Sequence, residues 1–237
     1  MPYLLYIIFG ILPSIIWLLF YLRKDSHPES NWMVLKIFFY GMLAAAVAAF
    51  LEIGVFKVFN GLGQRNVLTL ALNTFLGVAL TEELLKYLVI HLTTLRSPEL
   101  DEPLDVALYM IIAALGFAGL ENIIILFYAD LGGYLLETAA FSAFRFISAT
   151  FLHALCSGLV GYFAARSFLK TKKRLWYLAL GLLIATLLHG AYNFSIIFIR
   201  GGQRFILPVI ILVLLAFYLS WDLKKLKRLK SICLIKS

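Results

Sequence analysis

The chain has 237 residues, of which 62% are hydrophobic and only 14% are charged. A soluble domain is about half apolar and about one quarter charged, so this chain has more apolar surface than its own core can bury. Lipid must therefore surround much of it. The net charge of +8 does not indicate nucleic-acid binding, because the basic residues flank the hydrophobic segments, as in membrane proteins.

Seven apolar segments are long enough to cross a bilayer, which takes roughly 20 helical residues. In chain order they cover residues 2–22, 33–59, 67–95, 104–129, 142–168, 175–199 and 205–221. A stretch at 134–141, just before the fifth segment, is predicted to lie at the membrane interface. The sequence thus predicts an all-α bundle of about seven transmembrane helices. It forms one transmembrane domain, residues 1–237, of a multi-pass protein of the cell membrane.

The distribution of Lys and Arg predicts an outside N-terminus and an inside C-terminus, because basic residues concentrate in inside loops. The inside loops and the basic tail at 222–237 then hold fourteen basic residues: Arg23, Lys24, Arg96, Arg166, Lys170, Lys172, Lys173, Arg174, Lys224, Lys225, Lys227, Arg228, Lys230 and Lys236. The outside loops hold only three, which are Arg65, Arg200 and Arg204.

Two adjacent carboxylates and a lysine lie inside the third segment. Glu82 is four residues from Lys86 and Glu83 is three residues from it, so both carboxylates reach one ammonium on a helix. One lysine cannot neutralise two glutamates. Either one glutamate stays protonated, or a further cation or donor approaches. A carboxyl group in such a partly dry site suits general acid–base chemistry.

The fourth and fifth segments add further polar groups at membrane depth, where a charge costs at least a few kcal/mol. Glu121 and Asn122 follow a Gly-rich stretch that favours close helix packing. Arg145, His153 and Ser157 are spaced eight and four residues apart, which predicts one stripe on a single helix. Arg145 is predicted to be a counter-ion for the carboxylate of the Glu82–Glu83 pair that Lys86 leaves unneutralised.

The sixth segment places His189 and Asn193 on one helical face, four residues apart. A histidine beside an amide donor suits the positioning of water or the stabilisation of an oxyanion. Measured from the outer ends of their segments, four of these side chains lie at similar depth, roughly 12 to 22 Å. They are predicted to meet in one buried site: Glu82, Glu121, His153 and His189.

These motifs together resemble the PrsW family of intramembrane proteases, within a wider group that includes the CAAX-prenyl endopeptidases and the Abi proteins. The resemblance covers about residues 67–200 and rests on Glu82-Glu83-x-x-Lys86, Phe117-x-x-x-Glu121-Asn122, His153 and His189-x-x-x-Asn193. The CAAX relatives carry Arg and His where Lys86 and Glu121 stand here, which favours the PrsW branch and argues against prenylated substrates.

The resemblance implies a glutamate-dependent endopeptidase that cleaves membrane-anchored anti-sigma factors near the outer face, as the first step of regulated proteolysis. Residues 67–200 would form its catalytic core. The predicted catalytic residues are Glu82, Glu83, Glu121, His153, His189 and Asn193, with Lys86, Asn122 and Arg145 in support. Glu82, alone or with Glu83, would activate a water, while His189 and Asn193 would orient it or stabilise the oxyanion.

The expected partners are a membrane-anchored protein substrate and the lipid bilayer, with no nucleic acid and no cofactor. Three alternatives stay open at this stage. Two histidines and a glutamate are able to bind zinc, although no His-Glu-x-x-His sequence occurs. Buried Glu, Lys and His also mark proton and ion pathways in transporters and channels, but no inverted repeat is evident. A non-catalytic immunity protein would tolerate loss of the glutamates.

Overall fold

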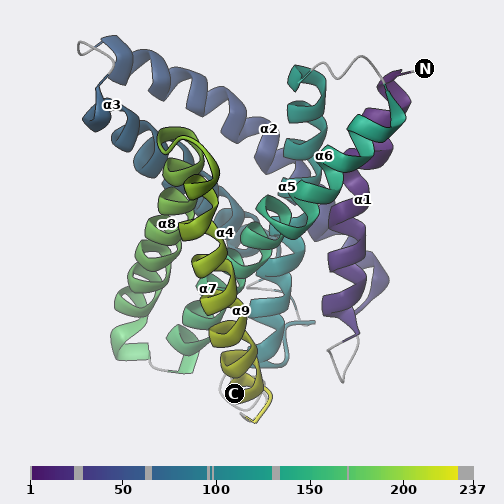
Figure 1. Ribbon diagram of the computed structural model, residues 1–237. Coiled ribbons are helices and arrows are strands. Elements are labelled where there is room, and N and C mark those ends of the chain that lie inside the picture. Colours follow the sequence, from purple (N-terminus) through teal and green to yellow (C-terminus); the bar gives the residue numbers. More distant parts are fainter. Residues whose placement is uncertain are drawn as a thin grey trace.

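The computed structural model describes residues 2–23, 29–61, 66–94, 97, 99–129, 134–169 and 171–228, and all regular structure in these ranges is helical. Figure 1 shows the helices as a bundle. In chain order the elements are α1 (Pro2–Leu22), α2 (Asn31–Gly61), α3 (Val67–Leu72), the π-helix η1 (Asn73–Leu80), α4 (Thr81–Thr93), α5 (Pro103–Ala129), α6 (Leu135–Ile147), α7 (Ala149–Leu169), η2 (Thr171–Lys173), α8 (Arg174–Phe198), η3 (Gly202–Phe205) and α9 (Ile206–Leu226).

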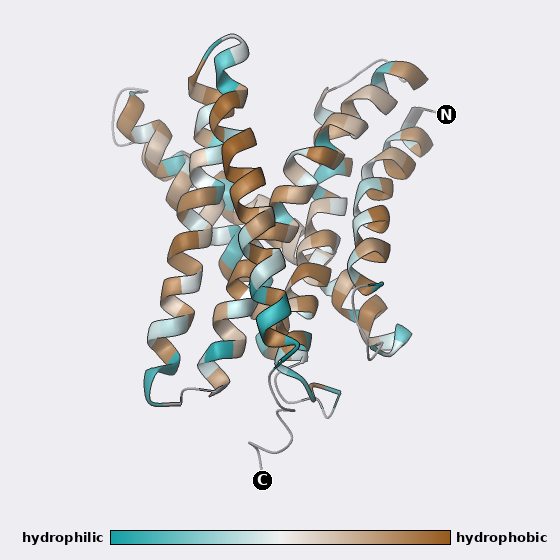
Figure 2. Ribbon diagram, turned by 60° about the horizontal axis from the view of Figure 1, so that its bottom comes forward, coloured by the Kyte–Doolittle hydropathy of each residue, from teal (hydrophilic) through white to brown (hydrophobic). Residues whose placement is uncertain are grey.

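Within the described residues, seven helical segments are long and apolar enough to cross a membrane, which confirms the predicted number of spans and the multi-pass membrane class. Figure 2 shows hydrophobic residues along most of the length of the helices. Large apolar side chains such as Leu4, Phe50 and Phe217 are exposed there, because lipid is their solvent. The predicted third span ended at Leu95, which lies outside the described residues.

Helix α5 forms the centre of the bundle and packs against α1, α2 and α7. Glycine permits its close crossing with α2. A Cβ atom on Gly116 would lie 1.9 Å from the carbonyl oxygen of Phe38, and one on Gly41 would lie 2.1 Å from that of Ala113. Only glycine fits such an approach of two backbones. The crossing fixes the direction in which the following turn of α5 presents Glu121.

Two spans depart from the single straight helices that the sequence predicts. The third span is α-helical at both ends but becomes a π-helix, η1, for the eight residues before Thr81. The fifth predicted span, 142–168, is present within a longer apolar segment, Leu135–Phe168, but it is not one helix. Helix α6 ends at Ile147 and α7 begins at Ala149, because Ser148 has non-helical φ and ψ of −117° and −90°. The chain changes direction at this serine.

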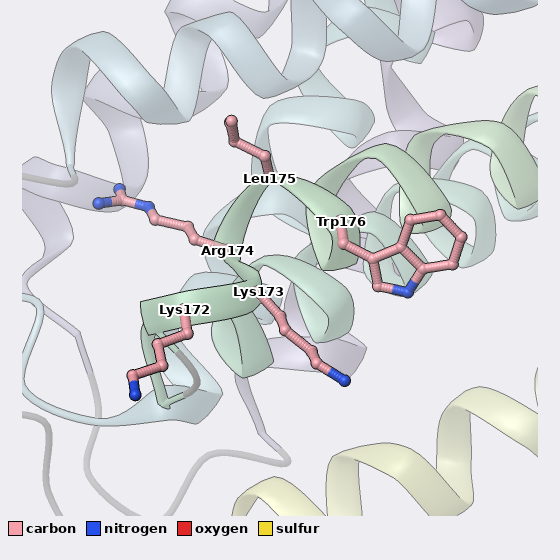
Figure 3. Close-up of a pocket in the computed structure, with 5 residues that line it drawn as sticks. All are labelled: Lys172, Lys173, Arg174, Leu175 and Trp176. Atoms are coloured by element: carbon pink, nitrogen blue, oxygen red, sulfur yellow. The ribbon is translucent and has the colours of Figure 1, made fainter.

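Basic side chains gather at the end of the bundle where α9 ends. Figure 3 shows Lys172, Lys173 and Arg174 at the turn between α7 and α8, beside Trp176. All four side chains are exposed. Figure 1 places this turn at the same end of the molecule as the C-terminal part of α9, which carries Lys224 and Lys225.

Candidate active site

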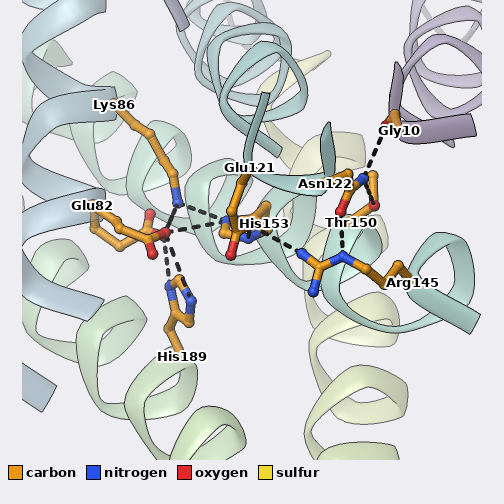
Figure 4. A network of polar contacts seen from close by, with 10 residues as sticks. Gly10, Glu82, Lys86, Glu121, Asn122, Arg145, Thr150, His153 and His189 are labelled. Atoms are coloured by element: carbon orange, nitrogen blue, oxygen red, sulfur yellow. Dashed lines mark hydrogen bonds and ion pairs between the residues drawn. The ribbon is translucent and has the colours of Figure 1, made fainter. Parts of the chain in front are cut away.

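Lys86 lies at the centre of a buried polar cluster between α4, α7 and α8 (Figure 4). Its ammonium nitrogen is 3.0 Å from Glu82 Oε2, 2.9 Å from Glu83 Oε1 and 2.8 Å from His153 Nδ1. An ammonium has three protons to donate, so each of them has an acceptor. The ring of Phe117 covers the ammonium at 4.4 Å. The helical spacing of both glutamates to Lys86 is thereby confirmed.

Glu83 is fully buried, and both of its oxygens accept hydrogen bonds. Oε1 accepts from Lys86 and from His189 Nδ1 at 3.1 Å, while Oε2 accepts from Ser157 at 2.9 Å. The sequence left two ways to balance a second glutamate, a retained proton or a further donor. The structure supplies the donors, from α7 and α8.

Glu82 is less enclosed than Glu83, with 3% of its surface exposed. Its Oε2 accepts from Lys86, and no described residue forms a hydrogen bond with its Oε1. His189 Nε2 lies 3.9 Å from Glu82 Oε2. Because His189 Nδ1 faces the Glu83 carboxylate, its hydrogen is assigned to Nδ1 and Nε2 is an acceptor. Two acceptors at this separation suit a water molecule that donates to both.

A second carboxylate orients His153 from the other side. His153 Nδ1 accepts from Lys86, so the ring hydrogen is assigned to Nε2, which is 2.8 Å from Glu121 Oε2. The same Glu121 oxygen pairs with Arg145 Nη2 at 3.2 Å. His153 is therefore held between a cation and a carboxylate and has no free ring nitrogen.

Asn122 connects this pair to the neighbouring helices. Its Oδ1 accepts from Arg145 Nε, and its Nδ2 donates to the Gly10 carbonyl at 3.2 Å and to Thr150 Oγ1 at 3.0 Å. These bonds join α5 to α1, α6 and α7 (Figure 4). Neither Thr150 nor Gly10 was singled out from the sequence. The only signal for Thr150 is a polar residue inside a predicted span, and no sequence signal identifies the Gly10 carbonyl as an acceptor.

The structure brings together eight of the nine predicted site residues: Glu82, Glu83, Lys86, Glu121, Asn122, Arg145, His153 and His189. The prediction that Glu82, Glu121, His153 and His189 meet in one site is confirmed by these contacts. Asn193 is half-buried one turn beyond His189 and forms no hydrogen bond with the described residues of the cluster.

The predicted placement of Arg145 is wrong in two respects. Arg145 does not share a helical stripe with His153, because the break at Ser148 puts it on α6. Its carboxylate partner is Glu121, and it does not pair with Glu82 or Glu83. The side chain still reaches the cluster, because α6 packs against α7 and α5.

Comparison with known proteins decides the family of this cluster. The family model described as "PrsW family intramembrane metalloprotease" matches residues 29–220. The chain belongs to the PrsW family of intramembrane proteases. This confirms the resemblance that the glutamate, lysine and histidine motifs indicated. No solved structure matches the chain.

Curated PrsW proteases match over most of their length. The chain is similar to "Protease PrsW" of Geobacillus kaustophilus, with 31% identity over 79% of this chain and 78% of the relative. The protein of that name from Bacillus subtilis is 30% identical over 94% of both chains. The one from Clostridioides difficile is 28% identical over 87% of this chain and 84% of the relative.

The family description includes a metal, so we tested whether these PrsW side chains fit one. Ligand atoms of Glu82, His153 and His189 all lie within 4.8 Å of one another. A tetrahedral zinc ion about 2.1 Å from its ligands separates them by about 3.4 Å. Glu82 Oε2 and His153 Nδ1 are 3.5 Å apart. By residue type and spacing these three side chains suit zinc.

Lys86 prevents that fit, because its ammonium is bonded to two of the three ligand atoms. A zinc ion about 2.1 Å from both atoms would lie at most about 3.5 Å from the Lys86 nitrogen, whatever its direction. At an effective dielectric constant of about 20, this contact costs about 9 kcal/mol of Coulomb repulsion. The side chains as arranged around Lys86 do not fit a metal ion.

Proposed function

We propose that this protease hydrolyses a peptide bond in a single-pass, membrane-anchored regulatory protein such as an anti-sigma factor, with Glu82 as the general base. One observation carries the proposal: Glu82 Oε1 accepts no hydrogen bond from the described part of the chain, and Glu82 lies beside the acceptor nitrogen of His189 inside a buried cluster. Membership of a protease family supports hydrolysis over a transporter, a channel or an immunity protein.

In the first step, a water held between Glu82 and His189 attacks the carbonyl carbon of the substrate. The water oxygen bonds to that carbon while Glu82 accepts the water proton. In the second step, the carbon–nitrogen bond breaks and Glu82 gives the proton to the leaving amine nitrogen. Water and peptide thereby become a carboxylic acid and an amine, and Glu82 returns to its starting state.

The remaining side chains have positioning roles in this proposal. Glu83, with hydrogen bonds on both oxygens, holds Lys86 and His189 in place. Asn193 lies on the His189 face of α8, where its amide would donate to the developing oxyanion. His153 orients Glu82 through Lys86, and is itself held by Glu121.

The basic end of the bundle supports an inside C-terminus, because Lys172, Lys173 and Arg174 lie at the end where α9 finishes. His189 is then nine residues, and Glu121 eight residues, from the outer ends of α8 and α5. At 1.5 Å per residue the cluster lies about 12 to 14 Å below the outer surface. Cleavage would therefore occur in the outer half of the bilayer.

The experiment is to co-express doubly tagged single-pass candidate substrates with the wild-type protease, Glu82→Gln or Glu83→Gln. The wild-type protein should release a fragment that Glu82→Gln does not release, with a rate loss of about 100-fold or more, as expected for a missing general base. Glu137→Gln is the matched control, because Glu137 is an exposed carboxylate on α6. Cleavage by Glu82→Gln at the wild-type rate would refute Glu82 as the general base, and cleavage by both cluster variants at that rate would refute the whole proposal.

A further inference from the structure

The buried cluster already contains a cation, and it comes from the chain itself. Lys86 is 0% exposed and uses all three of its donors on Glu82, Glu83 and His153. These three acceptors belong to two different helices, and Glu83 extends the link to His189 on a third. The ammonium therefore holds the helices of the site together through its hydrogen bonds, as a bound metal ion does through its ligands.

The histidines around Lys86 have the surroundings of metal-binding histidines. Each of them donates one ring N–H to a carboxylate: His153 Nε2 donates to Glu121 at 2.8 Å, and His189 Nδ1 donates to Glu83 at 3.1 Å. Such outer carboxylates fix the tautomer and leave the other ring nitrogen as an acceptor. These acceptor nitrogens are the ones that approach Glu82 Oε2: His153 Nδ1, which accepts from Lys86, at 3.5 Å, and His189 Nε2 at 3.9 Å.

We infer that the Lys86 ammonium takes the place of a metal ion in this protease, and that Glu82, His153 and His189 become a zinc site once Lys86 is removed. The three side chains supply two imidazole nitrogens and one carboxylate oxygen, which is a zinc ligand set. The inference rests on the proposed function only in treating Glu82 and His189 as the reactive pair.

Displacement of Lys86 by a metal in the wild-type protein is opposed by its packing. The ammonium has no exposed surface, and the Phe117 ring covers it at 4.4 Å. Leaving the centre would break the contacts with Glu82, Glu83 and His153 together. The ammonium is covalently attached to α4 and stays in the site, whereas a metal ion would have to bind from solution.

The test measures metal content in purified protein, which does not depend on a substrate. Wild type and Lys86→Leu are incubated with zinc chloride in detergent, desalted, and analysed by inductively coupled plasma mass spectrometry. Lys86→Leu should retain about one zinc per chain and wild type less than about one tenth of that. Bound zinc should also raise the melting temperature of Lys86→Leu alone, because a ligand stabilises the state that binds it.

Two controls assign the zinc to these ligands. Lys86→Leu with His189→Ala should retain no zinc, since one ligand is missing. Lys57→Leu should also stay free of zinc, because Lys57 is an exposed lysine on α2 outside the cluster.

If Lys86→Leu does not fold, the double variant Lys86→Leu with Glu83→Gln takes its place, because it removes one charge of each sign and keeps all three ligands.

Three results would overturn the inference. The first is about one zinc per wild-type chain that is lost in His189→Ala. The second is a folded Lys86→Leu, or folded double variant, that retains no zinc. The third is as much zinc in Lys57→Leu as in Lys86→Leu. The proposed function fails separately. A zinc-free wild-type protein that cleaves no membrane-anchored substrate would refute the hydrolysis by Glu82 and leave the inference about Lys86 intact. A zinc-loaded wild-type protein that cleaves would refute the inference about Lys86 and leave intact only the hydrolysis of a membrane-anchored substrate.

Discussion

Replacing Gly116 by Ala tests how strongly the α2–α5 crossing controls the site. The new methyl group would lie 1.9 Å from the Phe38 carbonyl oxygen and 2.8 Å from its carbon, both of which are backbone atoms. Ordinary contact begins at 3.4 Å, so α2 has to move by about 1.5 Å, beyond the range in which packing contacts are kept.

The expected cost follows from this displacement. Overpacking costs about 1 to 3 kcal/mol, and the upper end applies because a backbone carbonyl cannot rotate away as a side chain does. Alanine returns up to about 1 kcal/mol through its higher helix propensity. The free energy of unfolding should therefore fall by about 2 kcal/mol. In a chain of this length that lowers the melting temperature by about 4 to 8 °C.

Thermal unfolding in detergent measures this loss, and cleavage measures its effect on the site. The residue after Gly116 is Phe117, whose ring covers Lys86, so cleavage should fall by about 10-fold or more. Gly54→Ala is the matched control, because a Cβ atom there meets nothing within 4 Å. If Gly116→Ala melts at the same temperature as Gly54→Ala, the crossing is not as tight as the structure indicates.

Three further predictions concern the cluster itself. Ser157→Ala removes a donor to the Glu83 carboxylate, a bond worth about 1.5 to 3 kcal/mol, so cleavage by purified protein should fall about 10-fold; an unchanged rate would contradict this. Arg145→Gln removes both the largely buried ion pair with Glu121 and the hydrogen bond to Asn122, so thermal unfolding should show a loss of about 3 kcal/mol or more, and a loss below about 1 kcal/mol would mean that water screens the pair. A metal chelator should leave cleavage unchanged, because Lys86 supplies the cation; inhibition that added zinc reverses would argue against this.

Much of the fold could be predicted because lipid imposes a simple rule on sequence. An apolar run of about 20 residues has to be a helix, since no other single segment satisfies its own backbone in a membrane. The first predicted span agrees with α1 at both ends, Pro2 and Leu22. Contacts within one helical turn could also be predicted from the sequence. Both glutamates contact Lys86, as their spacing of three and four residues indicates.

The remaining features depend on contacts between helices, which spacing along one helix does not contain. The break at Ser148 carries neither Gly nor Pro, the usual signals of a helix end. Without that break Arg145 was assigned to the helix of His153, and its partner Glu121 was missed. The contact between Lys86 and His153, 67 residues apart in the chain, likewise had no local signal.

The π-helix η1 has a consequence for how this protein is compared with its relatives. Each residue of a π-helix turns the chain through a smaller angle than a residue of an α-helix, since its hydrogen bonds close at i+5. A helical wheel drawn through residues 67–93 as one α-helix therefore points Glu82 and Glu83 in the wrong direction relative to Val67. Register as well as residue identity sets the position of this pair, so a single-residue insertion or deletion within Asn73–Leu80 would rotate both carboxylates without changing either of them.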